Sequence, residues 1–450
     1  MAPSIPDEET GLASKTPTKP SEADEVQVEP IVEGHHGSIL SRVTARLHSL
    51  NFFETRGIER VPVEERHEAK ASDYMQMALL WFSTNITANN MAVGMLGPLD
   101  YSLGFVDCAL CATFGALLGA AGVAYMGTFG PVKGPASQCP STRSDKSLYR
   151  WAWVPQFVAV FVLIGSAGPK FDTSIESTGS SETIAGNRLS FFSLCLSAAV
   201  AWAPAGADFY VYFPPTTSKW KTFLLTFLGV GLAITFANLV GIGLASGTLT
   251  QPSWADAFNT SSGALVVAGY SGLGGFGKFL GVLVALGLIA NNIPGTYSAG
   301  LGFQIMGRYL AKVPRWLLST VGVVIYTACA LGGRNELYEI FENFLALMGY
   351  WVTIYLMIAF EEHVIFRRTR GFDWDAWSDP SRLPVGIAAL AAFLVGWAGA
   401  IVCMDQVWYV GPIAKMVGED GSDLGIWVGV SWAMLVFPPL RWWELKKFNR

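Results

Sequence analysis

The chain has 450 residues, of which 51% are hydrophobic and only 14% are charged. A soluble domain usually carries about 25% charged residues, so this composition excludes an ordinary soluble protein and favours a membrane protein. The net charge of −5 offers no basic surface for nucleic acid.

The N-terminal region, residues 1–74, is rich in Pro, Ser, Thr, Glu and Lys and is predicted to be a cytoplasmic tail, largely disordered over its first 35 residues. No cleavable signal peptide is predicted there, because those residues are polar and acidic. The stretch 39–53 places apolar residues at helical spacing with basic residues between them. It fits either an amphipathic helix on the inner membrane surface or a tail helix that packs on the rest of the protein.

From residue 75 the pattern changes, because ten segments lack Asp, Glu, Lys and Arg and reach the length of about 20 apolar residues that crosses a bilayer as a helix. These segments are 75–99, 108–132, 151–169, 189–207, 222–247, 279–303, 316–333, 343–360, 383–404 and 424–440. None alternates apolar and polar residues as a β-barrel strand does. Residues 75–440 are therefore predicted to be an all-α bundle in the lipid bilayer, with the Gly- and Ser-rich stretch 257–277 as an external loop able to dip into the membrane.

Basic residues predict the orientation, because loops on the cytoplasmic side carry more Lys and Arg. If the N-terminus is inside, seventeen basic residues lie on the inner side and five on the outer side. Both termini are therefore predicted to be cytoplasmic, with 441–450 as a short C-terminal tail. The sequon Asn259-Thr260-Ser261 falls in a loop assigned outside, which agrees weakly with this orientation.

Polar residues and helix breakers inside apolar spans are costly, so they mark candidate sites. The first span contains an amide cluster, and glycines and a proline follow it. These residues are Asn85, Asn89 and Asn90, then Gly94, Gly97 and Pro98. Hydrogen bonding between packed helices is the alternative explanation, but three amides and a breaker exceed what packing needs.

Two further clusters have a similar character. The fourth span ends in Trp202, Pro204 and Gly206, where proline frees a backbone carbonyl and glycine allows the helix to unwind. The run 279–303 contains Asn291 and Asn292 close to Pro294 and Gly295. An amide matches the hydrogen-bonding edge of a planar heterocycle and an indole matches its face, so a planar polar solute is predicted. A proline-kinked packing helix remains the alternative for the third cluster.

The sequence does not support a nucleotide-binding, metal or catalytic site. The glycines of a G-x-G-x-x-G pattern, Gly272, Gly274 and Gly277, precede an apolar span and have no βαβ unit around them. Cys108 and Cys111 form a C-x-x-C inside an apolar run, which indicates small buried residues and not a metal site. With no Walker A pattern, zinc spacing or nucleophile elbow, we expect neither an enzyme nor an ATP-driven pump.

Several segments carry a resemblance to the fungal purine-cytosine permeases of the nucleobase-cation-symport-1 family, from about residue 75 to the C-terminus. They read WFSTNITANNMAVGMLGPLDYSLGF, TFGPVKG, RWAWVP, ADFYVYFP, GLGGFGKF, IANNIPGTYS and QVWYVGPIAK. The resemblance implies a transporter of twelve helices with the LeuT-like fold of two inverted five-helix repeats. It further implies a plasma-membrane symporter for purines and cytosine that uses a proton and no cofactor.

The resemblance also implies roles for individual residues. Ser83 would be the contact from the first helix, and Trp202 would stack on the base. Asn291 and Asn292, with Pro294, would form the polar site. The first span would pair with 189–207 as its repeat partner, and not with 279–303.

The chain departs from the family pattern after Gly134, where about fifteen polar residues lead directly to Arg150. The third and fourth helices of the family are therefore predicted to be absent, which explains ten spans instead of twelve. The missing third helix would provide a second stacking Trp and an amide, and Tyr149 stands where the family commonly has Glu. A transport-inactive permease-like protein, or the product of a misread gene, is the alternative to an active transporter.

Overall fold

The computed structural model describes residues 70–133, 153–307, 309–333, 337–369, 371–373, 376, 379, 381–419 and 421–450. The predictions for residues 1–69, among them the amphipathic stretch, lie outside the described residues, as does the junction 134–152. The described part is mostly helical, and its strands β1 (Asp405–Gln406) and β2 (Tyr409–Val410) pair antiparallel.

Each of the ten predicted spans corresponds to a helix or to a pair of helices. They are α2 (Ala71–Asn85) with α3 (Ala88–Leu99), α4 (Phe105–Gly127), α7 (Trp153–Ala167), α8 (Ser181–Val200), α9 (Lys219–Thr248), α12 (Gly274–Ile305), α13 (Arg315–Gly332), α14 (Leu337–Glu361), α15 (Ile387–Cys403) and α16 (Gly425–Phe448). Among the described residues, six segments are long and apolar enough to cross a membrane, and they contain α4, α8, α9, α12, α13 and α14. A helical membrane protein is confirmed, while ten crossings stay a prediction.

Two boundaries differ from the predictions. The stretch 257–277, predicted as a loop, contributes to α10 (Pro252–Thr260) and α11 (Ser262–Ala268) and to the start of α12. Helix α16 continues to Phe448, so most of the predicted C-terminal tail is helical. A short helix, α5 (Gly130–Lys133), follows α4.

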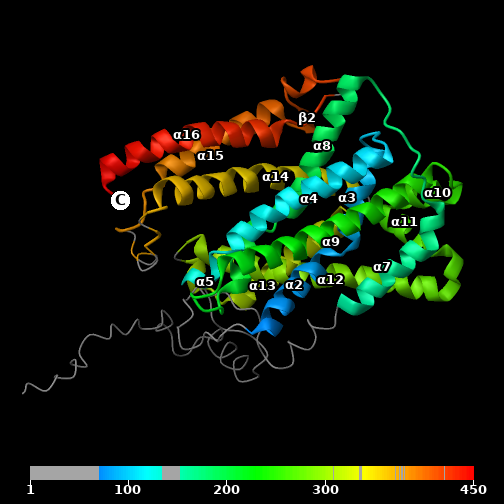
Figure 1. Cartoon of the computed structure of the whole chain (residues 1–450), viewed down its shortest axis with the longest axis horizontal. Helices are drawn as coiled ribbons and strands as arrows, with labels where there is room; N and C mark the ends of the chain where they lie inside the picture. The colour runs from blue at the N-terminus through cyan, green and yellow to red at the C-terminus, as the bar shows by residue number, and fades with distance from the viewer. Residues whose placement is uncertain are drawn as a thin grey trace, which may run out of the picture.

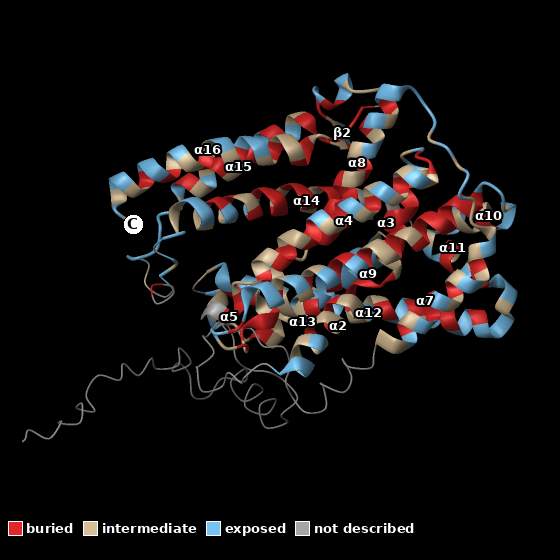
Figure 2. Cartoon of the chain, in the orientation of Figure 1, coloured by how far each residue is buried: buried red, intermediate tan, exposed pale blue. Residues whose placement is uncertain are grey.

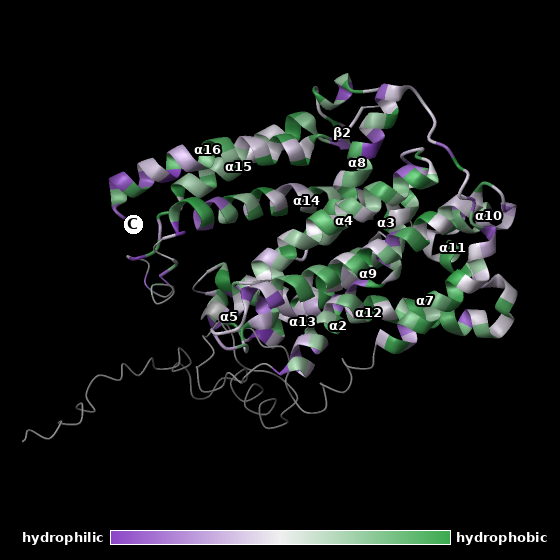
Figure 3. Cartoon of the chain, viewed as in Figure 1, coloured by the Kyte–Doolittle hydropathy of each residue, from purple (hydrophilic) through white to green (hydrophobic). Residues whose placement is uncertain are grey.

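The long helices lie in three groups (Figure 1). Helices α14, α15 and α16 pack together on one side, and α12 packs on α7 and α13 on the other. Helices α3, α4, α8 and α9 lie between them, and more than half of the residues of α3, α8 and α9 are buried (Figure 2). Hydrophobic residues run along the outer sides of the helices and hydrophilic residues gather at helix ends, as in a protein surrounded by lipid (Figure 3).

Small residues bring the central helices into backbone contact. A Cβ atom on Gly94 of α3 would lie 2.1 Å from the Asn238 carbonyl oxygen of α9, and one on Gly241 of α9 would lie 1.9 Å from the Met91 carbonyl oxygen of α3. These two contacts are reciprocal. Helices packed in this way in a membrane gain dispersion energy that larger residues would prevent.

Helix α13 has the opposite character. Only 6% of its most apolar stretch of residues is buried, and the helix packs mainly on α12. Large apolar residues are exposed on it, among them Val321, Val324, Ile325 and Leu331. This pair of helices therefore presents an extensive apolar surface that the described residues do not cover.

A buried ion-pair network fastens the C-terminal helix. The Arg441 guanidinium of α16 donates to Glu362 at 2.9 and 3.1 Å and to Glu444 at 3.3 Å, and its side chain is only 3% exposed. Glu362 lies in the π-helical turn η7 (Glu362–Phe366) that follows α14. Glu444 also accepts hydrogen bonds from the backbone N–H groups of Gly386 and Ala388 at the start of α15. One arginine therefore connects the ends of three helices.

Replacing Arg441 with Met is expected to destabilise the protein by about 3–5 kcal/mol, because it leaves the buried Glu444 carboxylate without its cation and leaves Glu362 with Arg367 alone. Thermal unfolding of the full chain in lipid nanodiscs measures the effect. The matched control is Arg382→Met, since the Arg382–Asp373 pair is about half exposed and contributes about 0–1 kcal/mol. Equal melting temperatures for both variants would contradict the expectation.

Candidate functional site

A cavity of about 700 Å³ lies where the three polar clusters of the sequence meet. Four elements line it: the α2–α3 break, the segment after α8, and helices α12 and α14. The lining includes Asn85, Asn89, Asn90, Trp202, Pro204, Asp208, Asn291, Asn292, Gly295, Ser298, Met348 and Trp351. No Lys, Arg or His contributes to this part of the described structure, so the lining is mainly aromatic, amide and apolar, with one carboxylate.

The first span is broken at Ile86 and Thr87, between α2 and α3. Three carboxamides bind the carbonyls at the end of α2. The Nδ2 of Asn90 donates to the Asn85 carbonyl at 2.6 Å, the Nε2 of Gln156 donates to the Ile86 carbonyl at 3.1 Å, and the Nδ2 of Asn291 donates to the Thr84 carbonyl. Backbone groups freed in a membrane need such partners, so these amides stabilise the break.

The break leaves one side-chain acceptor on the cavity wall. Asn85 is fully buried and its Nδ2 donates to the Trp81 carbonyl at 2.8 Å. Its Oδ1 has no hydrogen-bond partner among the described residues. A buried polar atom without a partner is costly, and this one is closed to water, so a solute with an N–H group would satisfy it only after the break moves.

The structure places the predicted breakers of the first span elsewhere. Gly94 and Gly97 lie inside the continuous helix α3, and Pro98 lies in its last turn. A Cβ atom on Gly97 would lie 2.6 Å from the Cys108 sulfur, so this glycine serves close packing, as Gly94 does. The prediction that these three residues break the span is wrong, because a glycine required for contact with another helix gives the same sequence pattern.

The segment after α8 unwinds, as its proline and glycine predicted. Two 3₁₀ turns, η3 (Ala203–Ala205) and η4 (Asp208–Tyr210), replace the α-helix. Pro204 lines the cavity, whereas Gly206 is buried, and a Cβ atom on it would lie 2.8 Å from the Val123 carbonyl oxygen of α4. Gly206 therefore allows the unwound segment to pack closely on α4.

Trp202 lies on this unwound segment and faces the cavity. Its ring makes an edge-to-face contact with Trp81, with centroids 6.0 Å apart and an interplanar angle of 82°. Trp81 is itself fixed, since its Nε1 donates to the Tyr210 hydroxyl at 3.2 Å. The indole of Trp202 is therefore oriented by a buried neighbour while its other surface remains available to a ligand.

Helix α12 runs without interruption through Asn291, Asn292 and Pro294. Asn292 lines the cavity and makes no hydrogen bond within the described residues, whereas Asn291 lines the cavity and also binds the α2 carbonyl. Pro294 is buried in the helix and lies outside the cavity lining. The hydroxyl of Ser298, one turn further on, is buried without a partner in the described structure and also lines the cavity.

Ser83 is also outside the cavity lining, and its Oγ donates to the Leu80 carbonyl at 3.0 Å. Sequence reasoning missed the wall formed by α14, where Met348 and Trp351 lie. Their span contains no amide or proline in its apolar part, so only the hydrogen-bonding capacity of Trp351 could have marked it.

The chain is similar to known permeases. A family model described as "Permease for cytosine/purines, uracil, thiamine, allantoin" matches residues 60–165. The chain is 31% identical to the purine-cytosine permease fcyB of Emericella nidulans, over 91% of this chain and 92% of that protein. It is 30% identical to a purine-cytosine permease of Saccharomyces cerevisiae, over 97% and 95% of the two chains. A vitamin B6 transporter of the same yeast is 29% identical over 88% of each chain.

Proposed function

We infer that this chain, which belongs to the purine-cytosine permease family, carries purine bases or cytosine across the membrane by alternating access. The observation that carries the inference is the convergence of two unwound spans and two helices on one amide- and indole-lined cavity. The chain is a membrane permease and not an enzyme.

The chemistry of the cavity supports a nucleobase. A purine or cytosine has a planar face for Trp202 and an edge that alternates donors and acceptors. The exposed Asn292 amide on the cavity wall has donors and an acceptor for such an edge, and Asn85 Oδ1 is an unpaired acceptor buried in the opposite element. Because the described lining carries no cation and Asp208 as its one carboxylate, a neutral solute fits better than an anion.

The positions of the two breaks support the inverted-repeat fold. Discontinuous helices in corresponding positions of two repeats form the substrate site in LeuT-like transporters. The break between α2 and α3 and the unwound segment after α8 both line the cavity. The pairing of the first span with 189–207 therefore has support, and the Asn-rich helix α12 has no such break.

Ten helices, with the third and fourth of the family absent, are part of the proposal. An alignment with one purine-cytosine permease of Saccharomyces cerevisiae runs over 519 positions, whereas this chain has 450 residues. The difference exceeds the roughly 40 residues that two membrane crossings need. The exposed apolar surface of α12 and α13 supports this part of the proposal, because a further pair of helices in the family would have a face to cover.

Uptake of radiolabelled adenine or cytosine by a permease-deficient host that expresses the chain tests the function. We expect saturable uptake, and we expect Asn292→Ala to weaken the affinity about 5- to 150-fold, since a bidentate amide–base contact contributes about 1–3 kcal/mol. Gln251→Ala, an amide at the start of α10 and outside the cavity lining, is the control and should leave uptake unchanged.

Competition by unlabelled purines, cytosine and vitamin B6 in the same assay ranks the substrates, since one relative is a vitamin B6 transporter. Collapse of the proton gradient tests a proton as the coupling ion. Absence of uptake from a chain that reaches the plasma membrane with cytoplasmic termini would favour the transport-inactive alternative. Sequencing the transcript across codons 134–150 tests the misread-gene explanation, because a true transcript would then encode two more helices.

A further inference from the structure

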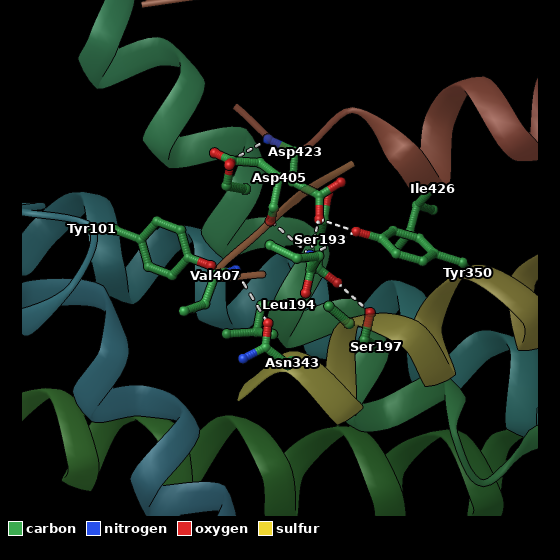
Figure 4. Close-up of a pocket in the computed structure, with 13 residues that line it drawn as sticks. Tyr101, Ser193, Leu194, Ser197, Asn343, Tyr350, Asp405, Val407, Asp423 and Ile426 are labelled. Atoms are coloured by element: carbon green, nitrogen blue, oxygen red, sulfur yellow. Dashed lines mark hydrogen bonds between the residues drawn. The ribbon is translucent and has the colours of Figure 1, made fainter. Parts of the chain in front are cut away.

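A second and much smaller cavity, of about 30 Å³, lies between α8, α14 and the connection from α15 to α16 (Figure 4). It has room for about one or two water molecules. Its polar lining includes Ser190, Ser193, Ser197, Tyr350, Gln406 and Asp423. Asp405 also lines it, and no Lys, Arg or His does so among the described residues.

Asp423 is the centre of this cluster and is only 7% exposed. Its carboxylate accepts hydrogen bonds from Gln406 Nε2 at 3.0 Å, from the Gly425 N–H at 2.8 Å and from the Tyr350 hydroxyl. Gln406 Nε2 also donates to the Tyr350 oxygen at 2.8 Å, so the tyrosine is left to donate its own proton to Asp423. All three donors favour an ionised carboxylate, although Gln406 shares its two amide protons with the Tyr350 oxygen and with the Asp405 carbonyl at 2.7 Å.

Burial has the opposite effect on the same group. Loss of water around Asp423, together with the nearby Asp405 carboxylate, raises its pKa to about 7 in spite of the three donors. The other titratable groups that face it are Tyr350 from α14, Cys403 from the end of α15, and Tyr101 from the turn after α3. None of these is a cation that would keep the carboxylate ionised.

The cluster is connected through two helices to the 700 Å³ cavity lined by Trp202 and Asn292, called the transport cavity below. Tyr350 of α14 binds Asp423, and the neighbouring Met348 and Trp351 line the transport cavity. On α8, Ser190 accepts a hydrogen bond from the Asp423 N–H at 2.8 Å, and the same helix leads into the segment that carries Trp202. A change at Asp423 therefore acts on two walls of the transport cavity.

We propose that Asp423 is a proton-binding site, separate from the transport cavity, whose ionised form holds α14 against α8 and whose protonated form releases it. On protonation the carboxylate gains one proton and loses one acceptor position, so one of its three donors must find another partner. Tyr350 is the donor from a membrane helix, and the adjacent small cavity can supply a water to accept its proton. The role in transport rests on the proposed function, whereas the titration of Asp423 does not.

The first measurement is thermal unfolding of the full chain in nanodiscs between pH 4 and 9. The pKa of Asp423 in the folded protein lies above its ordinary value of 3.8. The folded state therefore binds more protons than the unfolded state between pH 3.8 and about 7. This contribution to stability is therefore full at acid pH and is lost as the pH rises to about 7. The difference in melting temperature between wild type and Asp423→Asn should change over this range and remain constant above it.

A second variant keeps the carboxyl group. Tyr350→Phe removes one donor to the ionised form, so the upper end of the transition should move up by about one pH unit. Tyr355→Phe on the same helix is the matched control, since Tyr355 makes no hydrogen bond to the cluster, and it should behave as wild type. A pH profile unchanged in both Asp423→Asn and Tyr350→Phe would overturn the proton site.

The second measurement is base uptake as a function of external pH. If one obligatory proton binds at Asp423, apparent affinity should fall about tenfold per pH unit above its pKa in wild type and stay flat in Asp423→Asn. Uptake that retains its pH dependence in Asp423→Asn would overturn the proposed coupling but leave the transport function standing. No uptake in wild type, with the melting difference present, would refute the transport function and support the proton site.

Discussion

Replacing Trp202 by Ala is expected to reduce base affinity about 5- to 150-fold, because stacking of a base on an aromatic ring contributes about 1–3 kcal/mol. At substrate concentrations near the wild-type KM, uptake would then fall to between about a third and about a hundredth of the wild-type rate. Trp202→Phe should retain part of the affinity, since it keeps an aromatic face at the end of the unwound segment. Binding of labelled adenine to the purified chain, by scintillation proximity, measures both variants.

Trp220→Ala serves as the matched control for this experiment. Trp220 lies at the start of α9, is 70% exposed and stacks on Phe223 outside the transport cavity. It should leave base affinity unchanged. Equal losses in Trp202→Ala and Trp220→Ala would show a general effect on folding, and no loss in Trp202→Ala would remove this residue from the site.

The substitution Gly241→Ala, which adds a single methyl group, is expected to leave most of the molecules unfolded. The new Cβ atom would lie 1.9 Å from the Met91 carbonyl oxygen, so α3 and α9 would have to separate by more than 1 Å. Overpacking usually costs about 1–3 kcal/mol, and more where backbone must move, which exceeds the roughly 1 kcal/mol that Ala gains over Gly in a helix. Fluorescence-detected size exclusion of the tagged chain measures the folded fraction.

The control for Gly241→Ala is the same substitution at Gly322 of α13, where an added Cβ atom meets nothing within 4 Å. Gly322→Ala should match or slightly exceed the wild-type yield and melting temperature. If Gly241→Ala behaved like Gly322→Ala, the close approach of α3 and α9 would have to be looser than the structure describes.

The composition of the transport cavity could be predicted because polar groups inside a membrane carry a cost that needs an explanation. Asn85, Trp202 and Asn292 were each conspicuous in an apolar span, and the structure brings them to one cavity. Their role in binding a base stays a prediction. The wall formed by Met348 and Trp351 was not predictable, since ordinary apolar spans contain the same residue types.

The position of the first break could not be predicted for a different physical reason. Gly94 and Pro98 fit either a broken helix or a closely packed one, and only the backbone of α9 opposite Gly94 decides between them. The true break is stabilised by amides distant in sequence, from Gln156 and Asn291. The sequence did not mark Asp423 as a candidate site, because a carboxylate at the edge of a span is expected to lie in water. Its burial depends on α8 and α14, which are distant in sequence.

The reciprocal glycine contacts have a consequence for the motion of the protein. The backbones of α3 and α9 touch at Gly94 and Gly241. Those of α4 and α8 also approach at Gly115 and Gly119, where an added Cβ atom would lie 2.7 and 2.5 Å from a carbonyl oxygen of α8, so neither pair can slide without a steric collision. Each pair is therefore expected to move as one rigid body. We expect the rotation to be taken up at the two places where the α-helix is interrupted, Ile86–Thr87 and the turns around Pro204, so that the segments facing the solute would also be the hinges.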